Sequence, residues 1–256
     1  MRETMTYVGL DVHARSTHAA AIDVVSGELR RARFGGGNEQ VIEWLQSLPA
    51  PLAGCYEAGP TGFALYRAAE AAGLRVEVIA PSKTPRTPGD RVKSDRKDAE
   101  LLARLLLAGQ LKAVTVPPPP FEAARHLARA REQVRGDLMR CRHRVSKLLL
   151  LHGRVYDGSA WTKTHRRWLA QQRFDQPATE LAYLDCLAAV DGLAARKQAL
   201  DERLSRLAFE GDWAQTVARL RCFRGIDTLT AFVLALEIGD FHRFPRPAPR
   251  CTATAP

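Results

Sequence analysis

The chain has 256 residues, of which 46% are hydrophobic, and a formal net charge of +10. This length allows one large domain or two smaller ones, each with a buried core. There is no apolar run long enough to span a bilayer, no signal-peptide pattern, and no C-x-x-C pair among the five scattered cysteines. These features argue against a membrane protein, a disulfide framework and a zinc site, and they predict a cytoplasmic protein.

The positive charge is concentrated in the middle of the chain. Residues 111–175 contain 14 lysines and arginines against five acids, whereas the segments before and after them are nearly neutral. A localised basic segment is typical of proteins that bind a polyanion, usually nucleic acid.

The first third of the chain has the pattern of an α/β domain. Strands are predicted over residues 6–11, 18–24 and 28–34, and the turn at Ser26-Gly27 favours an antiparallel meander. A helix from Asn38, a strand over 52–57, a helix over 62–72 and a strand over 76–80 follow. This is the element order of the ribonuclease H-like fold, in which the first strand lies beside the fourth.

Acidic residues occupy three defined points of this pattern. Asp11 and Glu57 end the first and fourth strands, so we expect them at one edge of the sheet. Residues 93–100 open the next helix, and Asp95 and Asp98 share one face of its first turn. Four carboxylates brought together in this way form an oxygen-rich site for Mg²⁺ or Mn²⁺.

Three segments around these acids, Tyr7–His13, Tyr56–Gly62 and Lys93–Ala99, resemble the acidic motifs of the insertion-sequence 110 transposases. These proteins are also called DEDD transposases or bridge recombinases. The resemblance implies a resolvase-like ribonuclease H domain and DNA transposition guided by a structured non-coding RNA of the element. The catalytic and metal-binding residues that it implies are Asp11, Glu57, Asp95 and Asp98.

Two features beside the acids remain open at this point. His13 and His18 fit a turn or an exposed strand better than a metal site. Gly59–Gly62 either offers backbone N–H groups to a phosphate or forms an ordinary turn with Thr61 as the N-cap of the next helix.

The second half of the chain is predicted to be helical. Pro117–Pro120 forms a stiff linker, and residues 121–151 follow as one long helix. Apolar stripes of coiled-coil type run from Val134 to Leu148 and from Cys186 to Leu207, the second interrupted by Lys197. The two helices pair either as an antiparallel hairpin or as the contact of a homo-oligomer.

Basic side chains cover the other faces of the first long helix and the segment after it. Trp161 and Trp168 lie among them, and they either stack on bases or fasten residues 153–176 to the hairpin. The predicted nucleic-acid-binding residues are Arg125, Arg129, Arg135, Arg140, Arg142, Arg144, Lys147, Lys163, Arg166 and Arg167.

The C-terminal segment resembles the start of the family's C-terminal transposase domain, which carries a nucleophilic serine. No serine follows Ser205, and the last residues are a Pro/Ala/Thr-rich stretch that we expect to be disordered. We therefore expect a truncated copy without this nucleophile. A helix over 228–238 would then leave an apolar patch partly exposed to solvent, which would lower solubility. The patch residues are Leu229, Phe232, Val233 and Leu236.

The sequence thus predicts three parts: a ribonuclease H-like DEDD domain (1–116), a basic helical coiled-coil region (117–212) and a partial C-terminal domain (213–256). The leading interpretation is a nucleoid-associated DNA transposase with DNA and RNA partners. One alternative is a nucleic-acid-binding remnant without complete chemistry. A sugar-kinase-like ATPase also begins with a strand, an Asp and a meander, but it needs glycines where this chain has Val12–Arg15.

Overall fold

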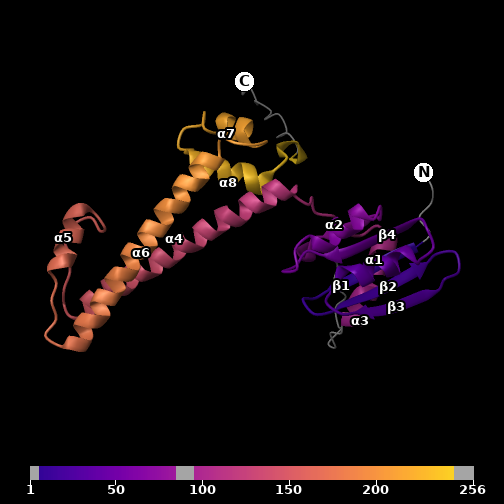
Figure 1. Cartoon of the computed structure of the whole chain (residues 1–256), viewed down its shortest axis with the longest axis horizontal. Helices are drawn as coiled ribbons and strands as arrows, with labels where there is room; N and C mark the ends of the chain where they lie inside the picture. The colour runs from indigo at the N-terminus through magenta and orange to yellow at the C-terminus, as the bar shows by residue number, and fades with distance from the viewer. Residues whose placement is uncertain (1–5, 85–94, 245–256) are drawn as a thin grey trace, which may run out of the picture. The chain divides into compact units, whose positions relative to one another are not determined.

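The computed structural model describes residues 6–84 and 95–244, apart from the side chains of Lys83, Asp95, Arg96 and Arg243. The chain divides into two compact units, Met1–Val116 and Pro117–Pro256 (Figure 1). The predicted disordered tail, residues 245–256, lies outside the described residues. None of the described helices is both long and apolar enough to cross a membrane.

The first unit is built on a five-stranded mixed sheet with the strand order β3-β2-β1-β4-β5. The predicted antiparallel meander and the parallel pairing of the first and fourth strands are both confirmed. The elements are β1 (Thr6–Val12), β2 (Thr17–Asp23), β3 (Leu29–Phe34), α1 (Asn38–Gln46), β4 (Leu52–Glu57), α2 (Ala64–Ala71), β5 (Val76–Ile79), the 3-10 turn η1 (Pro81–Lys83) and α3 (Asp95–Leu107).

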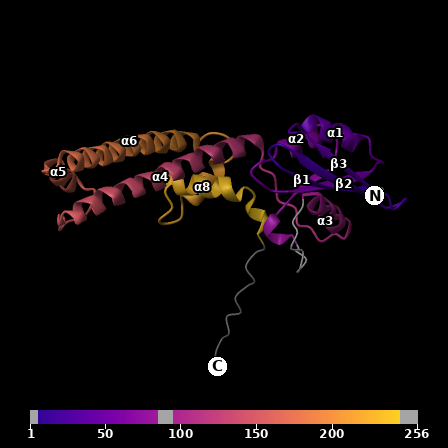
Figure 2. The ribbon, with the colours of Figure 1, turned by 90° about the horizontal axis from the view of Figure 1, so that it is seen from below.

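Alternation along β1 separates two faces of the sheet, because successive side chains of a strand point to opposite sides. Val8 and Leu10 are fully buried in a core that they share with Val41 and Leu45 of α1 and Leu65 of α2. Figure 2 shows α1 and α2 on one side of the strands and α3 on the other. The residues of β1 between these buried positions therefore face α3.

Helix α3 packs closely on β1 because the strand has a glycine at the crossing point. A Cβ atom added to Gly9 would lie 2.1 Å from the carbonyl oxygen of Ala99 and 2.5 Å from the backbone nitrogen of Ala103. The small side chains of Ala99 and Ala103 are themselves buried. Beside them, Leu102 packs against Cys55 of β4. The backbone of α3 thus packs directly against the backbone of β1 at Gly9.

The second unit is helical and is dominated by a hairpin. Helices α4 and α6 run side by side along most of their length (Figure 1), so the chain forms the antiparallel hairpin by itself. The elements are α4 (Pro119–Leu151), α5 (Lys163–Gln171), α6 (Pro177–Leu207), α7 (Ala214–Leu220), α8 (Thr228–Ile238) and the 3-10 turn η2 (Phe241–Arg243).

An ion-pair network explains the interruption of the second apolar stripe. Lys197 lies at a stripe position of α6 and donates to Asp201 at 2.5 Å, while Arg131 of α4 donates to the same carboxylate at 2.7 Å. Burial opposes ionisation of Asp201, but these two hydrogen bonds outweigh it and lower its pKa. Arg131 therefore joins the two helices through Asp201, and Lys197 supports that carboxylate from within α6.

The apolar patch predicted on α8 is mostly covered. Phe232 and Leu236 are fully buried in a core with Ala124 and Ala128 of α4 and with Trp213. The expectation that these two side chains stay uncovered is wrong, because the end of the hairpin and the segment leading into α7 supply a surface for them.

One prediction follows from the crossing of α3 and β1. Replacing Gly9 with Ala should destabilise the first unit by about 1–3 kcal/mol, since backbone atoms of α3 would have to move away from the added methyl group. Hydrogen exchange of β1 and α3 peptides during urea titration measures this unit alone.

Gly35 is the matched control, because a Cβ atom at this position meets nothing within 4 Å. Gly35→Ala should change stability by less than about 0.5 kcal/mol. Equal effects of the two substitutions would show that the close packing at Gly9 does not limit the fold.

Candidate active site and nucleic-acid interface

Asp11 and Glu57 lie next to each other at the carboxyl ends of two parallel strands. Leu10 of β1 pairs with Tyr56 of β4, so the acids are the following residues in the same register. Leu10 and Tyr56 are buried in the core beneath α1 and α2, and the acids therefore belong to the opposite face, against which α3 packs. Glu57 is exposed and Asp11 is half-buried. The sequence predicted this adjacency.

Two histidines border Asp11. His13 lies in the turn after β1, and its Nε2 is 3.0 Å from the Oδ2 atom of Asp11. His18 lies on β2 directly opposite Asp11 in the antiparallel ladder. These are the turn and strand positions that the sequence indicated. The sequence did not indicate that both histidines lie next to Asp11, because this depends on the pairing of the strands.

The remaining two acids lie at the start of α3. Asp98 is half-buried, and the side chain of Asp95 lies outside the described residues. The described side chains contain no group of three or more His, Cys, Asp or Glu residues placed to hold a metal ion. The convergence of all four acids stays a prediction.

Cys55 lies two residues before Glu57 on β4, in contact with α3, and is not a candidate nucleophile. Its thiol is fully buried, and burial together with the nearby carboxylates of Glu77 and Glu57 raises its pKa to about 12. A thiol with this pKa is protonated at neutral pH and is inert.

The Gly59–Gly62 turn does not cap α2 through Thr61. The N-cap position is Phe63, and it makes no side-chain capping bond. Gly62 has a φ of +66°, and its carbonyl oxygen accepts a hydrogen bond of 3.2 Å from the Tyr56 hydroxyl. The Thr61 hydroxyl is buried without a partner in the described part of the chain. Its interpretation as a cap is therefore wrong.

Several arginines of the basic segment have structural partners. Arg125 donates from Nε to the carbonyl oxygen of Leu236 at 2.6 Å, and Arg129 forms a bidentate pair with Glu237 at 2.9 and 3.0 Å. Both bonds hold the C-terminal end of α8 on α4. These two arginines therefore have a role within the fold.

Other predicted binding residues take part in exposed ion pairs. Arg135 pairs with Glu132 and Arg140 with Asp137, each three residues away on α4. Arg166 of α5 pairs with Asp191 of α6. Exposed pairs of this kind contribute between zero and about 1 kcal/mol, so a phosphate can compete for these cations.

The predicted binding residues without such partners lie toward the α5 end of the hairpin. Lys147, Lys163 and Arg167 are exposed and form no ion pair within the described ranges. The Nη2 atom of Arg144 is 2.7 Å from the sulfur of Cys141. These residues form the most available part of the predicted interface.

The tryptophans of residues 153–176 pack against the hairpin. Trp161 and Trp168 are half-buried against the core formed by α4, α5 and α6. Arg142 lies over the Trp161 ring at 4.9 Å, and the backbone N–H of Trp161 donates to Nδ1 of His165 at 2.8 Å. Of the two open interpretations, the structure favours fastening of the loop over base stacking.

The chain belongs to the DEDD transposase family of insertion sequence 110. Residues 8–153 match the sequence profile of this family, which is described as a transposase family. The match contains β1 from Val8 onward, β4, helix α3 and all of α4. Members of the family are recombinases that move DNA.

Two curated relatives agree with this assignment. The putative transposase y4qE of Sinorhizobium fredii is 38% identical over 249 residues, which cover 94% of this chain and 60% of that protein. The transposase for insertion sequence element IS1533 of Leptospira borgpetersenii is 33% identical over 242 residues, covering 92% of this chain and 70% of that protein. The chain therefore spans only part of the length of these relatives.

The environment of His165 predicts that the stability of the second unit depends on pH. Burial lowers the pKa of this side chain from its ordinary value of 6.5, and its Nδ1 atom accepts the Trp161 bond only in the neutral ring. The stability that His165 contributes is thus fully present above pH 6.5 and is lost as the pH falls below it. Tryptophan fluorescence during urea unfolding at about pH 7.5 and about pH 5.5 measures the loss.

His165→Gln is the control, because glutamine does not titrate in this range. The variant should be less stable than the wild type at the higher pH and should depend less on pH. If the stability of both proteins depends equally on pH, groups other than His165 cause the dependence.

Proposed function

We propose that the first unit is a ribonuclease H-like catalytic domain that cleaves DNA strands with a divalent metal ion during transposition. The observation that carries this proposal is the placement of Asp11 and Glu57 side by side on neighbouring parallel strands of a family member. The strand order, with the first strand central and beside the fourth, is the order expected for this fold.

The donor set suits a hard cation. Carboxylate oxygens are the ligands that Mg²⁺ and Mn²⁺ prefer, and the face that carries Asp11 and Glu57 also receives α3, whose first turn begins with Asp95. Asp11, Glu57, Asp95 and Asp98 would hold the ions. When bound, the metal supplies Lewis-acid activation of the attacking oxygen and stabilisation of the leaving oxygen of a phosphodiester.

The residues of the chain itself supply position and charge in this proposal. The parallel ladder fixes the separation of the two strand acids, and the packing of α3 at Gly9 fixes the helix that bears the other two. His13, through its contact with Asp11, holds that carboxylate in one orientation. Rigid elements thus orient the acids before the substrate binds.

The second unit is proposed to bind the nucleic acids. Its first helix and the following loop carry the basic segment, and exposed cations at the α5 end are available for phosphates. The family resemblance suggests that the partners are DNA and a structured non-coding RNA of the element, and that the coiled-coil helices also form a homo-oligomer. The proposed division into parts remains 1–116, 117–212 and 213–256.

The proposed metal site is tested by calorimetric titration with Mn²⁺ and Mg²⁺. Asp11→Asn and Glu57→Gln should each weaken binding at least about tenfold, because each removes a charged ligand. Both variants should be slightly more stable without metal, since repulsion among the acids is relieved.

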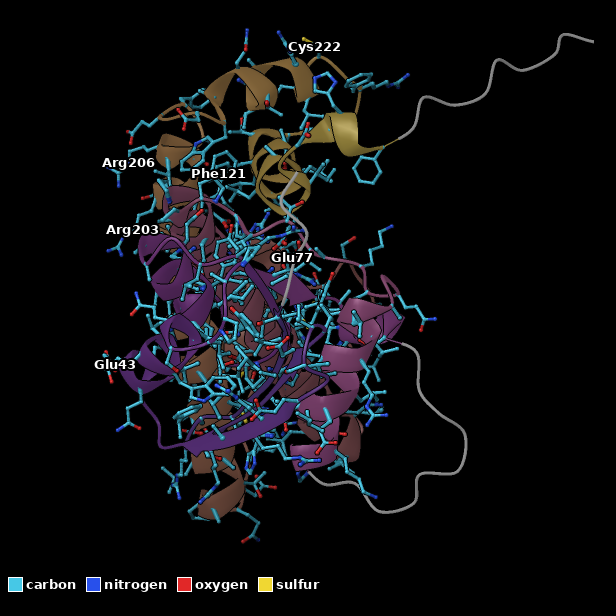
Figure 3. All side chains as sticks on the ribbon, turned by 90° about the vertical axis from the view of Figure 1, so that its right-hand side faces the viewer. Glu43, Glu77, Phe121, Arg203, Arg206 and Cys222 are labelled. Carbon is cyan, nitrogen blue, oxygen red and sulfur yellow. The ribbon has the colours of Figure 1, made fainter. Side chains whose placement is uncertain are left out.

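Glu77→Gln is the matched control. Glu77, labelled in Figure 3, lies on β5 opposite Cys55, and its carboxylate already accepts from Arg75 at 2.8 and 3.2 Å. This variant should titrate like the wild type. If Asp11→Asn and Glu57→Gln do so as well, the chain is a nucleic-acid-binding protein without the proposed metal chemistry.

The proposed interface is tested by the salt dependence of DNA binding. Combined replacement of Lys147, Lys163 and Arg167 with Gln should make the log–log slope shallower by about two to three, because each phosphate contact contributes about 0.7–0.9. Fluorescence anisotropy with labelled DNA measures this slope.

The control removes the same charge from the opposite helix of the hairpin. Arg196, Arg203 and Arg206 of α6 are exposed, and the latter two project outward in Figure 3. Their combined replacement with Gln should leave the slope nearly unchanged. Equal slopes for the two triple variants would mean that net charge alone determines binding.

A further inference from the structure

A row of four side chains crosses the sheet beside the acidic pair. Asp11 pairs with His18 across β1 and β2, and His18 pairs with Arg33 across β2 and β3. Glu57 extends the row on the other side of Asp11, because Tyr56 pairs with Leu10. Residues opposite each other on neighbouring strands share one face, so two carboxylates, an imidazole and a guanidinium follow one another.

The row that contains Asp11 is accessible to solvent. The neighbouring row on the same face, which contains Gly9 and Arg31, is covered by α3. In the covered row, Gly9 lies under the backbone of the helix, and Arg31 donates to Glu100 of α3. In the row of the acids, Arg33 and Glu57 are exposed, and Asp11 is half-buried. A ligand from solvent can therefore reach this row.

Arg33 differs from the other arginines of β3. Arg30 lies on the opposite face and donates to Glu28 at 2.9 Å, and Arg31 is bound by Glu100. Arg33 forms no hydrogen bond or ion pair with any part of the chain that the structure describes. A guanidinium without an acidic partner presents a planar set of donors that matches the oxygens of a phosphate.

We infer that Arg33, together with His18, holds a backbone phosphate of the DNA strand on which the acidic pair acts. The inference rests on the proposed function, because the acids occupy the other end of the row. Two strand spacings, about 10 Å, separate Arg33 from Asp11. A nucleic acid strand covers this distance in about three nucleotides, so a strand crossing the sheet places one phosphate at each end.

The negative and positive ends of the row then have different tasks. Arg33 binds the strand without a metal ion, because its charge is complementary to the phosphate. The acids repel the strand until a cation neutralises them. DNA binding in the absence of metal therefore isolates the contribution of Arg33.

The first measurement compares Arg33→Gln with Arg30→Gln in the full chain. A labelled DNA hairpin with a single-stranded overhang is titrated without divalent metal at several salt concentrations. Arg33→Gln should weaken binding severalfold and make the salt slope shallower by about one, as expected for one lost phosphate contact. Arg30→Gln, with the same loss of charge on the same strand, should behave like the wild type.

The second measurement locates the contact. Single phosphates of the overhang are replaced one by one with neutral methylphosphonates. The wild type and Arg30→Gln should lose affinity at one position, and Arg33→Gln should be insensitive at that position. The same profile in both variants, including a profile without a sensitive position, would overturn the inference.

The matched RNA hairpin identifies the nature of the strand. A defect of Arg33→Gln that is confined to RNA would overturn the assignment to DNA. The metal titrations of Asp11→Asn and Glu57→Gln are independent of these measurements. A failure of the proposed metal site and a failure of the phosphate contact are therefore distinguishable.

Discussion

The close packing of α3 on β1 is the constraint on which the first unit depends. Gly9 has no side chain, and Ala99 and Ala103 have small ones, so the helix backbone lies directly on the strand. Asp95 precedes Ala99 by one helical turn, and Asp11 follows Gly9 by one strand repeat. The residues that allow the crossing are therefore close in sequence to the proposed metal ligands on both elements. A larger side chain at Gly9 would displace the helix and its acids together.

In the second unit, some basic side chains stabilise the fold and others are available to bind nucleic acid. Arg131 of α4 reaches across to Asp201 of α6, which Lys197 also binds within α6, while Arg125 and Arg129 hold the end of α8. These bonds are directed at fixed partners within the chain. Lys147, Lys163 and Arg167 form no ion pair among the described residues, so their charges are available to phosphates. The number of basic residues in this segment is therefore larger than the number of cations that are free of acidic partners on the described surface.

The pattern of the sequence predicted most elements of the fold. The strands over residues 6–11 and 18–24, the turn at Ser26-Gly27 and the stripe from Val134 to Leu148 were predicted from the pattern of neighbouring residues, and the structure has these elements within a few residues. The adjacency of Asp11 and Glu57 was predictable for a further reason. Both acids end a strand, and parallel neighbours end at the same edge of a sheet. The cap at Thr61 and the uncovered Phe232 were wrong because turn geometry and distant packing override local pattern.

The sequence by itself determined the periodic elements, the acids at the strand ends and the location of excess charge, because these are properties of neighbouring residues. Only the tertiary structure decided which residues share a row or a partner. Asp11, His18 and Arg33 are separated along the chain, and the register of two antiparallel ladders brings them together on one face. Arg129 and Glu237 pair across more than a hundred residues. Such contacts depend on strand register and helix packing, which a one-dimensional pattern does not contain.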